Sequence, residues 1–165
     1  MGRLHDCGKC KEFIPHPHLD RLKDLTSRQK PRFVLIDGHF DWNGVGVRDE
    51  WLQAILAKIR GCPQHTFPIL SKKPEGFGRF SYPENVMLGA TVTNEGKEPF
   101  REMTDRPNDI EDWKRIEILR AFEGNRRFIS FEPLLGPLPE HVSLSGIDWV
   151  IIERRKACSY GPAVA

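Results

Sequence analysis

The sequence predicts an α/β fold built around a parallel sheet. Apolar runs without polar alternation recur along the chain, and such runs are typical of strands that are buried on both faces. Helical patterns or long connections separate the runs, as the right-handed crossovers between parallel strands require. About five strands are expected, which is fewer than the eight that close a TIM barrel. We therefore expect a partial, open parallel β/α barrel, and a flat doubly wound sheet is the alternative.

The expected strands are short apolar segments, each followed by polar or turn-forming residues. They span residues 33–36, 66–70, 86–92, 128–132 and 147–152. Pro68 lies inside the second segment and has no N–H to donate, so this segment is awkward as a central strand. Pro133 should end regular pairing directly after Glu132, which leaves a carboxylate at the carboxyl end of a strand.

Apolar residues at helical spacing predict the connecting helices. One helix should begin near Asp49, end at Gly61 and present an apolar face made of Trp51, Ile55, Leu56 and Ile59. A second helix, ended by Gly124, is indicated by Trp113, Ile116, Leu119 and Phe122. A short third helix is indicated by Leu19, Leu22 and Leu25.

The tryptophans and Cys62 are expected to differ in their roles. Trp51, Trp113 and Trp149 occupy positions typical of a core, whereas Trp42 follows the first strand in a glycine-rich loop. Trp42 is therefore the tryptophan that we expect to stack on a ligand. Cys62 follows a helix and precedes a proline, and we expect it to be a small packing residue.

The composition is that of an ordinary soluble globular protein. The chain has 165 residues, of which 29% are charged and 39% hydrophobic, so we expect one domain over residues 1–165. The net charge of +2 neither requires nor excludes a nucleic-acid partner. No apolar run approaches the length of a membrane span, and residues 1–6 hold no apolar signal region. A cytoplasmic protein without a membrane partner is expected.

The first 16 residues are expected to be irregular and to hold a candidate metal site. Cys7 and Cys10 form a CxxC motif, and three histidines lie close by in the sequence, namely His5, His16 and His18. Thiolate and imidazole groups suit both zinc and iron. One CxxC is only half of a structural zinc site, so the histidines would have to supply the remaining ligands. The alternative is an irregular terminus with free thiols.

A second candidate site lies at the carboxyl ends of the strands. Parallel strands all end at one edge of the sheet, so polar residues that follow them converge there. Glu132 and Lys72 are predicted to be catalytic, and ligand-binding roles are predicted for Asp37, Asp41, Thr91 and Asn94. This mixture suits a polar small molecule or a nucleotide-like ligand. The alternative is an internal ion-pair network, for example between Lys72 and Glu132. No GxGxxG or Walker sequence is present.

Several segments, in this order, carry a family resemblance. They are Phe33–Ile36 with Asp41, Cys62–Phe67, Leu70–Pro74, Pro83–Val92, Phe128–Pro137 and Gly146–Ile151. Together they resemble the phage gp-thirty-seven/gp-sixty-eight family, which is found in phages, bacteria and archaea and whose function is largely unknown. The resemblance covers roughly residues 13–153.

The resemblance implies a radical-SAM-type partial barrel. Members of that family typically carry three clustered cysteines, which would hold a [4Fe–4S] cluster and leave one iron open for S-adenosylmethionine. Here Cys7 and Cys10 match this cysteine cluster, and Lys11 stands where the family has tyrosine. The strand that precedes the cysteines in the family has no counterpart in this sequence.

Three functions follow as hypotheses. The first is a radical-SAM-type enzyme of unknown substrate, with nucleic acid as one substrate class. The second is a binding or regulatory module that lacks the cluster but retains a nucleotide-like pocket at the sheet edge. The third is a structural protein that is stabilised by zinc. The sequence predicts neither the substrate nor the oligomeric state.

Overall fold

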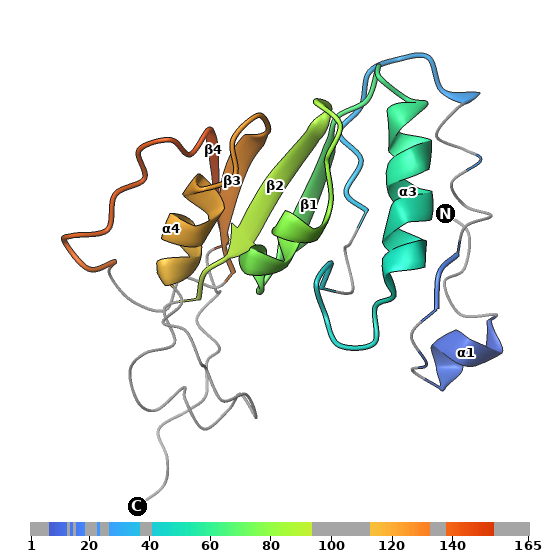
Figure 1. Ribbon diagram of the computed structural model, residues 1–165, viewed down its shortest axis with the longest axis horizontal. Coiled ribbons are helices and arrows are strands. Elements are labelled where there is room, and N and C mark those ends of the chain that lie inside the picture. The colour runs from blue at the N-terminus through green and yellow to red at the C-terminus, as the bar shows by residue number, and fades with distance from the viewer. Residues whose placement is uncertain are drawn as a thin grey trace, which may run out of the picture.

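The computed structural model describes residues 7–12, 14, 16–18, 23, 27–36, 41–93, 113–132 and 138–153. Within these residues the chain forms a mixed α/β structure around one sheet, with α3 and α4 flanking it (Figure 1). No helix among them is long and apolar enough to cross a lipid bilayer.

The sheet contains four parallel strands in the order in which they occur along the chain. They are β1 (Phe67–Ser71), β2 (Val86–Thr91), β3 (Arg126–Phe131) and β4 (Trp149–Ile152). The prediction of a parallel α/β sheet is confirmed, as are four of the predicted strands. The spatial order contains no reversal of the kind that defines a doubly wound sheet.

The predicted strand at residues 33–36 is wrong as a regular strand, because it forms only an isolated parallel bridge between Phe33 and Thr66. Two hydrogen bonds flank the bridge, from Val34 N to Thr66 O at 2.9 Å and from Thr66 N to Arg32 O at 2.8 Å. Successive residues of a strand form their backbone hydrogen bonds on alternate sides. After Thr66, the next residue of β1 that faces residues 33–36 is therefore Pro68. Because proline has no N–H, the ladder cannot continue past Thr66.

Two of the predicted helices are confirmed. They are α3 (Asp49–Arg60) and α4 (Lys114–Arg120). Asp49 and Glu50 lie in the first turn of α3 and Lys58 and Arg60 in its last turn, where each sign complements the helix dipole. The helix predicted from Leu19, Leu22 and Leu25 lies largely outside the described residues.

Two short helices had no counterpart in the predictions. They are α1 (Gly8–Lys11), a single turn in the N-terminal segment expected to be irregular, and the 3₁₀ helix η2 (Pro74–Arg79) between β1 and β2. Both are too short to show helical periodicity in the sequence, and Pro74 suits the first turn of η2 because its missing N–H is not needed there.

The two faces of the sheet have different neighbours. On the helix face, side chains such as Phe67, Leu88 and Ile129 join the buried residues of α3 and α4 in one hydrophobic core. On the opposite face, Phe128 covers Gly89, and any Cβ at Gly89 would collide with the Phe128 ring. A bulky aromatic side chain therefore occupies the space that the glycine leaves free.

Side chains from both edges of the sheet meet across this opposite face. The ring centroids of Phe33, beside β1, and Trp149, on β4, are 5.9 Å apart. The ring centroids of Phe128, on β3, and Trp149 are also 5.9 Å apart. Since β2 and β3 separate β1 from β4, the sheet must curl around this face for the outer rings to touch.

Candidate functional site

Four potential metal ligands gather in the N-terminal segment. One ligand atom each from Cys7, Cys10, His16 and His18 lies within 4.8 Å of the other three. The Cys7 Sγ to His16 Nε2 distance is 3.2 Å, and Cys10 Sγ lies 3.7 Å from His16 Nε2 and 3.1 Å from His18 Nε2. Zinc bond lengths of roughly 2.0–2.3 Å at tetrahedral angles imply separations of about 3.5 Å between sulfur and nitrogen ligands. The cluster could therefore bind a metal such as zinc.

Local backbone structure brings these ligands together. In α1, Lys11 N donates to Cys7 O at 3.2 Å, and this turn places both thiols of the CxxC near each other. Pro17 separates the two histidines, whose ring centroids are 4.6 Å apart. None of the residues of α1 is buried, so the hydrophobic core does not hold this turn.

The protonation of two ligands suits metal binding. His16 Nδ1 lies 2.7 Å from the carbonyl oxygen of Ile14, which can only accept, so Nδ1 must carry a proton, and in the neutral ring Nε2 is the nitrogen that can bind a metal. A hydrogen bond from the backbone of Cys10 lowers the pKa of the Cys7 thiol, and Lys9 and His16 act in the same direction. The structure thus brings the predicted ligands Cys7 and Cys10 together with His16 and His18, whereas His5 lies outside the described residues.

The second predicted site is divided into two parts, and the first is a network around Asp41. Its Oδ1 accepts from Ser71 Oγ at 2.5 Å and from Asn43 N at 3.0 Å, and its Oδ2 accepts from Lys72 N at 2.8 Å. Asn43 Nδ2 in turn donates to Ser71 Oγ at 3.3 Å and to Lys73 O at 2.9 Å. Asp41 was predicted to bind a ligand, but its oxygens are engaged in fixing the chain that leaves β1.

The second part lies at the carboxyl ends of β2 and β3. Thr91 and Ser130 are register partners on these strands and are both buried. Ser130 Oγ donates a hydrogen bond to Glu132 Oε1, and Glu132 is half-buried. Arg115 reaches this edge from α4 and donates from Nη1 to Thr91 O at 3.0 Å. Thr91 and Glu132, both predicted site residues, therefore lie close together.

Lys72 and Glu132 do not form the predicted ion pair. Among the described residues the recorded ion pair joins Arg79 Nη1 to Asp49 Oδ1 at 2.6 Å. Lys72 follows β1 and Glu132 follows β3, and β2 lies between these strands. Two side chains that start two strands apart must both lean across β2 to meet. The predicted ligand-binding residues Asp37 and Asn94 lie outside the described residues.

The prediction for Trp42 is wrong. Its side chain is fully buried, and its Nε1 donates to Tyr82 Oη at 3.2 Å. Cys62, by contrast, is buried in the core as predicted. Two edge residues were not anticipated, Ser130 and Arg115. Ser130 could have been found because it precedes Glu132 by two positions and thus shares its sheet face, but helical Arg115 gave no such signal.

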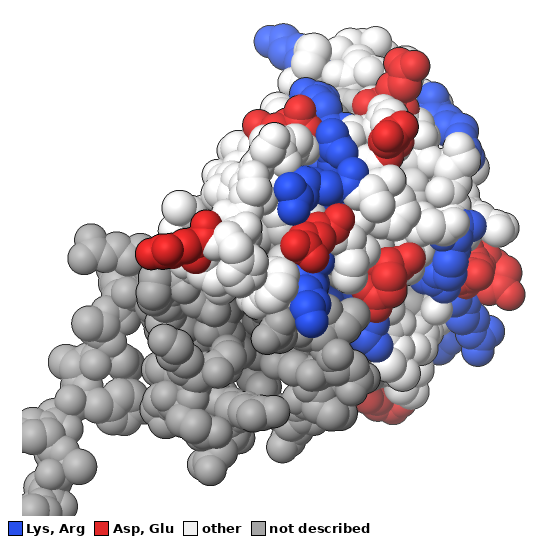
Figure 2. Space-filling model, turned by 60° about the vertical axis from the view of Figure 1, so that its left-hand side comes forward, with Lys and Arg blue, Asp and Glu red and all other residues white. Residues whose placement is uncertain are grey.

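Charge on the visible surface is mixed. On the face shown in Figure 2, Lys and Arg side chains lie between Asp and Glu side chains, and neither sign covers a continuous region. The net charge of the chain is +2. The described residues on this face therefore form no extended basic surface of the kind with which proteins bind duplex nucleic acid.

Comparison with protein families matches residues 9–153 to the model of a family described as a protein of unknown function, DUF5131. The matched range includes Cys10, both clustered histidines and all strands of the sheet. Neither a search of curated proteins nor a search of solved structures found a match. Since the family model spans most of the sequence, the chain belongs to the DUF5131 family.

Proposed function

We propose that this protein is a zinc-binding protein in which Cys7, Cys10, His16 and His18 complete one tetrahedral site. The observation that supports this proposal is that all four ligand atoms lie within 4.8 Å of one another. Two thiolates and two imidazoles are a common ligand set of structural zinc sites, which are closed by four protein ligands. In this role the zinc ion stabilises the fold of the N-terminal segment, and catalysis is not its function.

The experiment is metal analysis combined with cobalt substitution. We expect about one zinc ion per chain, a stoichiometry that follows from one set of four ligands. Cobalt added to the metal-free protein should give the visible absorption of tetrahedral coordination and a sulfur-to-cobalt charge-transfer band. Protein that contains neither zinc nor iron and does not bind cobalt would disprove the proposal.

A second candidate function is a radical-SAM-type enzyme with a partial parallel barrel, as the resemblance to the phage family implies. The sheet supports this candidate, because its strands follow chain order and Phe33 meets Trp149 across one face. A barrel-like curl of this kind would close around a substrate at the carboxyl edge. A [4Fe–4S] cluster bound by three thiolates would need a cysteine besides Cys7 and Cys10; Cys62 is buried in the core, and Cys158 lies outside the described residues.

The two candidates differ in what they predict for iron. Anaerobic reconstitution with iron and sulfide should leave a zinc protein colourless after desalting, whereas a cluster protein would retain the broad visible absorption of thiolate-bound iron. Retained iron with about four sulfides would favour the enzyme. Colourless protein that retains zinc would favour the structural zinc site.

Under either proposal, the carboxyl edge is the place where we propose that a polar ligand binds. Glu132 accepts from Ser130, and this bond leaves its second carboxylate oxygen for a ligand. The ligand is a nucleotide-like small molecule or part of a nucleic acid, and Lys72 would supply a positive charge. Glu132 would be the general base in the enzyme candidate.

The test of this edge is Glu132→Gln. The free energy of unfolding should change by less than about 1 kcal/mol, because no ion pair with Lys72 is lost. S-adenosylmethionine should raise the melting temperature of the wild type and fail to do so with the variant. Equal shifts for both proteins would show that Glu132 does not contact this ligand.

A further inference from the structure

A small cavity opens on the helix face of the sheet, away from both sites described above. Its volume is about 240 Å³, and its lining comes from residues 80–82 before β2, residues 122–125 after α4, and Leu88 of β2. It exists because the β1–β2 connection contains only the short helix η2, which leaves part of the helix layer open between α3 and α4 (Figure 1). Known ligand pockets start near roughly 300 Å³, so this cavity suits a single ring system.

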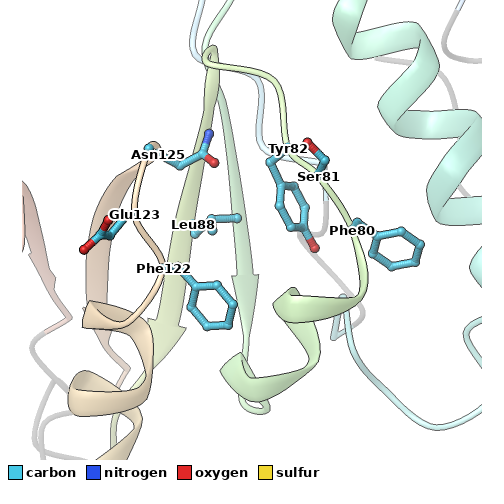
Figure 3. A pocket seen from close by; sticks show the side chains of 8 residues that line it. Phe80, Ser81, Tyr82, Leu88, Phe122, Glu123 and Asn125 are labelled. Atoms are coloured by element: carbon cyan, nitrogen blue, oxygen red, sulfur yellow. The ribbon is translucent and has the colours of Figure 1, made fainter.

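Aromatic side chains give the cavity flat and rigid walls. Leu88 forms part of the wall, with the ring of Phe122 below it and the ring of Tyr82 beside it in Figure 3. Phe77 is fully buried and packs edge to face against both, with ring centroids 6.0 Å from Phe122 and 5.8 Å from Tyr82. Because these walls are held in place before any ligand arrives, little conformational entropy is lost on binding.

Polar groups also line the cavity, and the amide of Asn125 has a fixed orientation among them. Asn125 Nδ2 donates to Pro83 O at 2.8 Å and to Val86 O at 3.2 Å. Both partners are carbonyl oxygens that can only accept, so the orientation of the amide is fixed with its oxygen on the other side. Figure 3 shows this oxygen turned toward the cavity, whereas the carboxylate of Glu123 points away from it. The cavity therefore offers a hydrogen-bond acceptor and no charge on its inner wall.

We propose that this cavity binds a nucleobase that carries an exocyclic amino group, with the ring between Tyr82 and Phe122 and the amino group donating to Asn125 Oδ1. Flat aromatic walls favour a planar ring, and a fixed acceptor selects for an N–H donor. The rim residues Ser81, Glu123 and Gly124 are exposed and mostly polar, which indicates a small ligand and argues against a large apolar partner surface.

This site is independent of the proposed zinc site and of the carboxyl edge. Asn125 precedes β3 and Val86 begins β2, so the cavity lies toward the amino ends of the strands. In parallel α/β folds that edge is seldom the place of chemistry. Occupancy of the cavity would thus add recognition of a base to whatever reaction or binding occurs at the opposite edge.

The experiment is titration of the full chain with adenosine and with purine riboside, which differs in lacking the amino group. Adenosine should bind saturably, and purine riboside should bind at least tenfold more weakly. Nuclear Overhauser contacts should connect the adenine protons with Leu88, Tyr82 and Phe122. The proposal would be overturned if the two nucleosides bound with equal affinity or if the contacts lay elsewhere on the protein. It would also be overturned if neither adenosine nor cytidine, which also carries an exocyclic amino group, bound saturably. N-acetyltryptophanamide presents an indole ring that is not a nucleobase. If this compound binds and adenosine does not, the proposal is also overturned.

A matched pair of variants locates the site. Leu88→Phe fills the cavity from its wall and should weaken adenosine binding at least tenfold. Leu144→Phe makes the same change at an exposed position outside the cavity and should leave binding unaltered. If Leu88→Phe does not fold, the wild-type Overhauser contacts decide the question alone. A folded Leu88→Phe protein that binds adenosine normally would contradict the assignment.

Discussion

The Cys/His cluster and the Asp41 network are both polar, but their order has different origins. The four cluster ligands lie within residues 7–18, and α1 buries no side chain. In the Asp41 network, Ser71 is only 1% exposed and Asn43 only 9%, and protein donors occupy the carboxylate. If the proposed zinc site is correct, the first region depends on a bound ion for its geometry, whereas the second is held by hydrogen bonds within the fold. Each region should tolerate the loss of the other.

Removal of one cluster ligand should have the largest effect. His16→Ala should lower zinc affinity roughly a thousandfold, about 4 kcal/mol out of the roughly 10–16 kcal/mol that structural zinc sites supply. Amide hydrogen exchange in residues 7–18 should accelerate, while β1–β4 remain protected. Competition with a zinc-binding dye measures the affinity, and His141→Ala is the control because exposed His141 contacts the ring of Trp113 and lies outside the cluster. Loss of protection throughout the sheet would show that the two regions are not independent.

A larger residue at Gly89 should lower the stability of the sheet and leave the Cys/His cluster unchanged. Gly89→Ala should destabilise the protein by about 3 kcal/mol, because its methyl group would overlap the buried Phe128 ring. Urea unfolding gives the free energy, and zinc stoichiometry should stay at the wild-type value. The double variant Gly89→Ala, Phe128→Leu should recover part of the loss. A destabilisation equal to the sum of the two single changes would argue against the steric explanation.

Asp41→Ala should destabilise the protein by about 2 kcal/mol, since three donors would lose their common acceptor. Asp41→Asn keeps one acceptor oxygen and should cost less than Asp41→Ala. Both variants should bind zinc like the wild type, which sharpens the contrast between the two regions. If instead Asp41→Ala is as stable as the wild type but loses ligand binding, the predicted ligand role of Asp41 is correct.

The smallest effect concerns Tyr82, which packs beside Trp42 on the helix face. Burial raises the pKa of Tyr82 to about 12 from its usual value of 10.0. The neutral phenol is therefore favoured in the folded state, and its stabilising contribution is complete below pH 10 and disappears as the pH rises to about 12. The chain has two tyrosines, Tyr82 and Tyr160. In the Tyr160→Phe variant, the phenolate absorbance therefore measures the titration of Tyr82 alone. Titration near pH 10 would contradict the burial of this side chain, and removal of zinc should not move the titration.

The sheet was predictable because strands buried on both faces appear as continuous apolar runs. The runs at residues 66–70, 86–92, 128–132 and 147–152 each form a strand. The run at residues 33–36 has the same composition, but its pairing depends on the neighbour, where Pro68 removes a donor. Composition is a local property, whereas a ladder requires donors on both strands.

The candidate sites were less predictable, and Trp42 and Lys72 show why. Trp42 follows a strand-like run in a glycine-rich segment, but its own side chain is fully buried and its indole is part of the core. Lys72 and Glu132 do follow strands that end at the same edge, but adjacency along that edge depends on strand order, which the sequence did not reveal. The CxxC and its histidines were easier to predict because all the ligands lie within twelve positions along the chain.

The proline in β1 also bears on how the protein behaves in a crowded solution. Exposed strand edges recruit strands of other molecules and thereby start aggregates. On the outer side of β1, Pro68 offers no amide hydrogen, and the carbonyl of Leu70 already accepts from Trp42 N at 3.4 Å. An incoming strand would find no donor at Pro68 and an acceptor already in use at Leu70. The same residue that shortens the sheet thus protects this edge from intermolecular β-pairing.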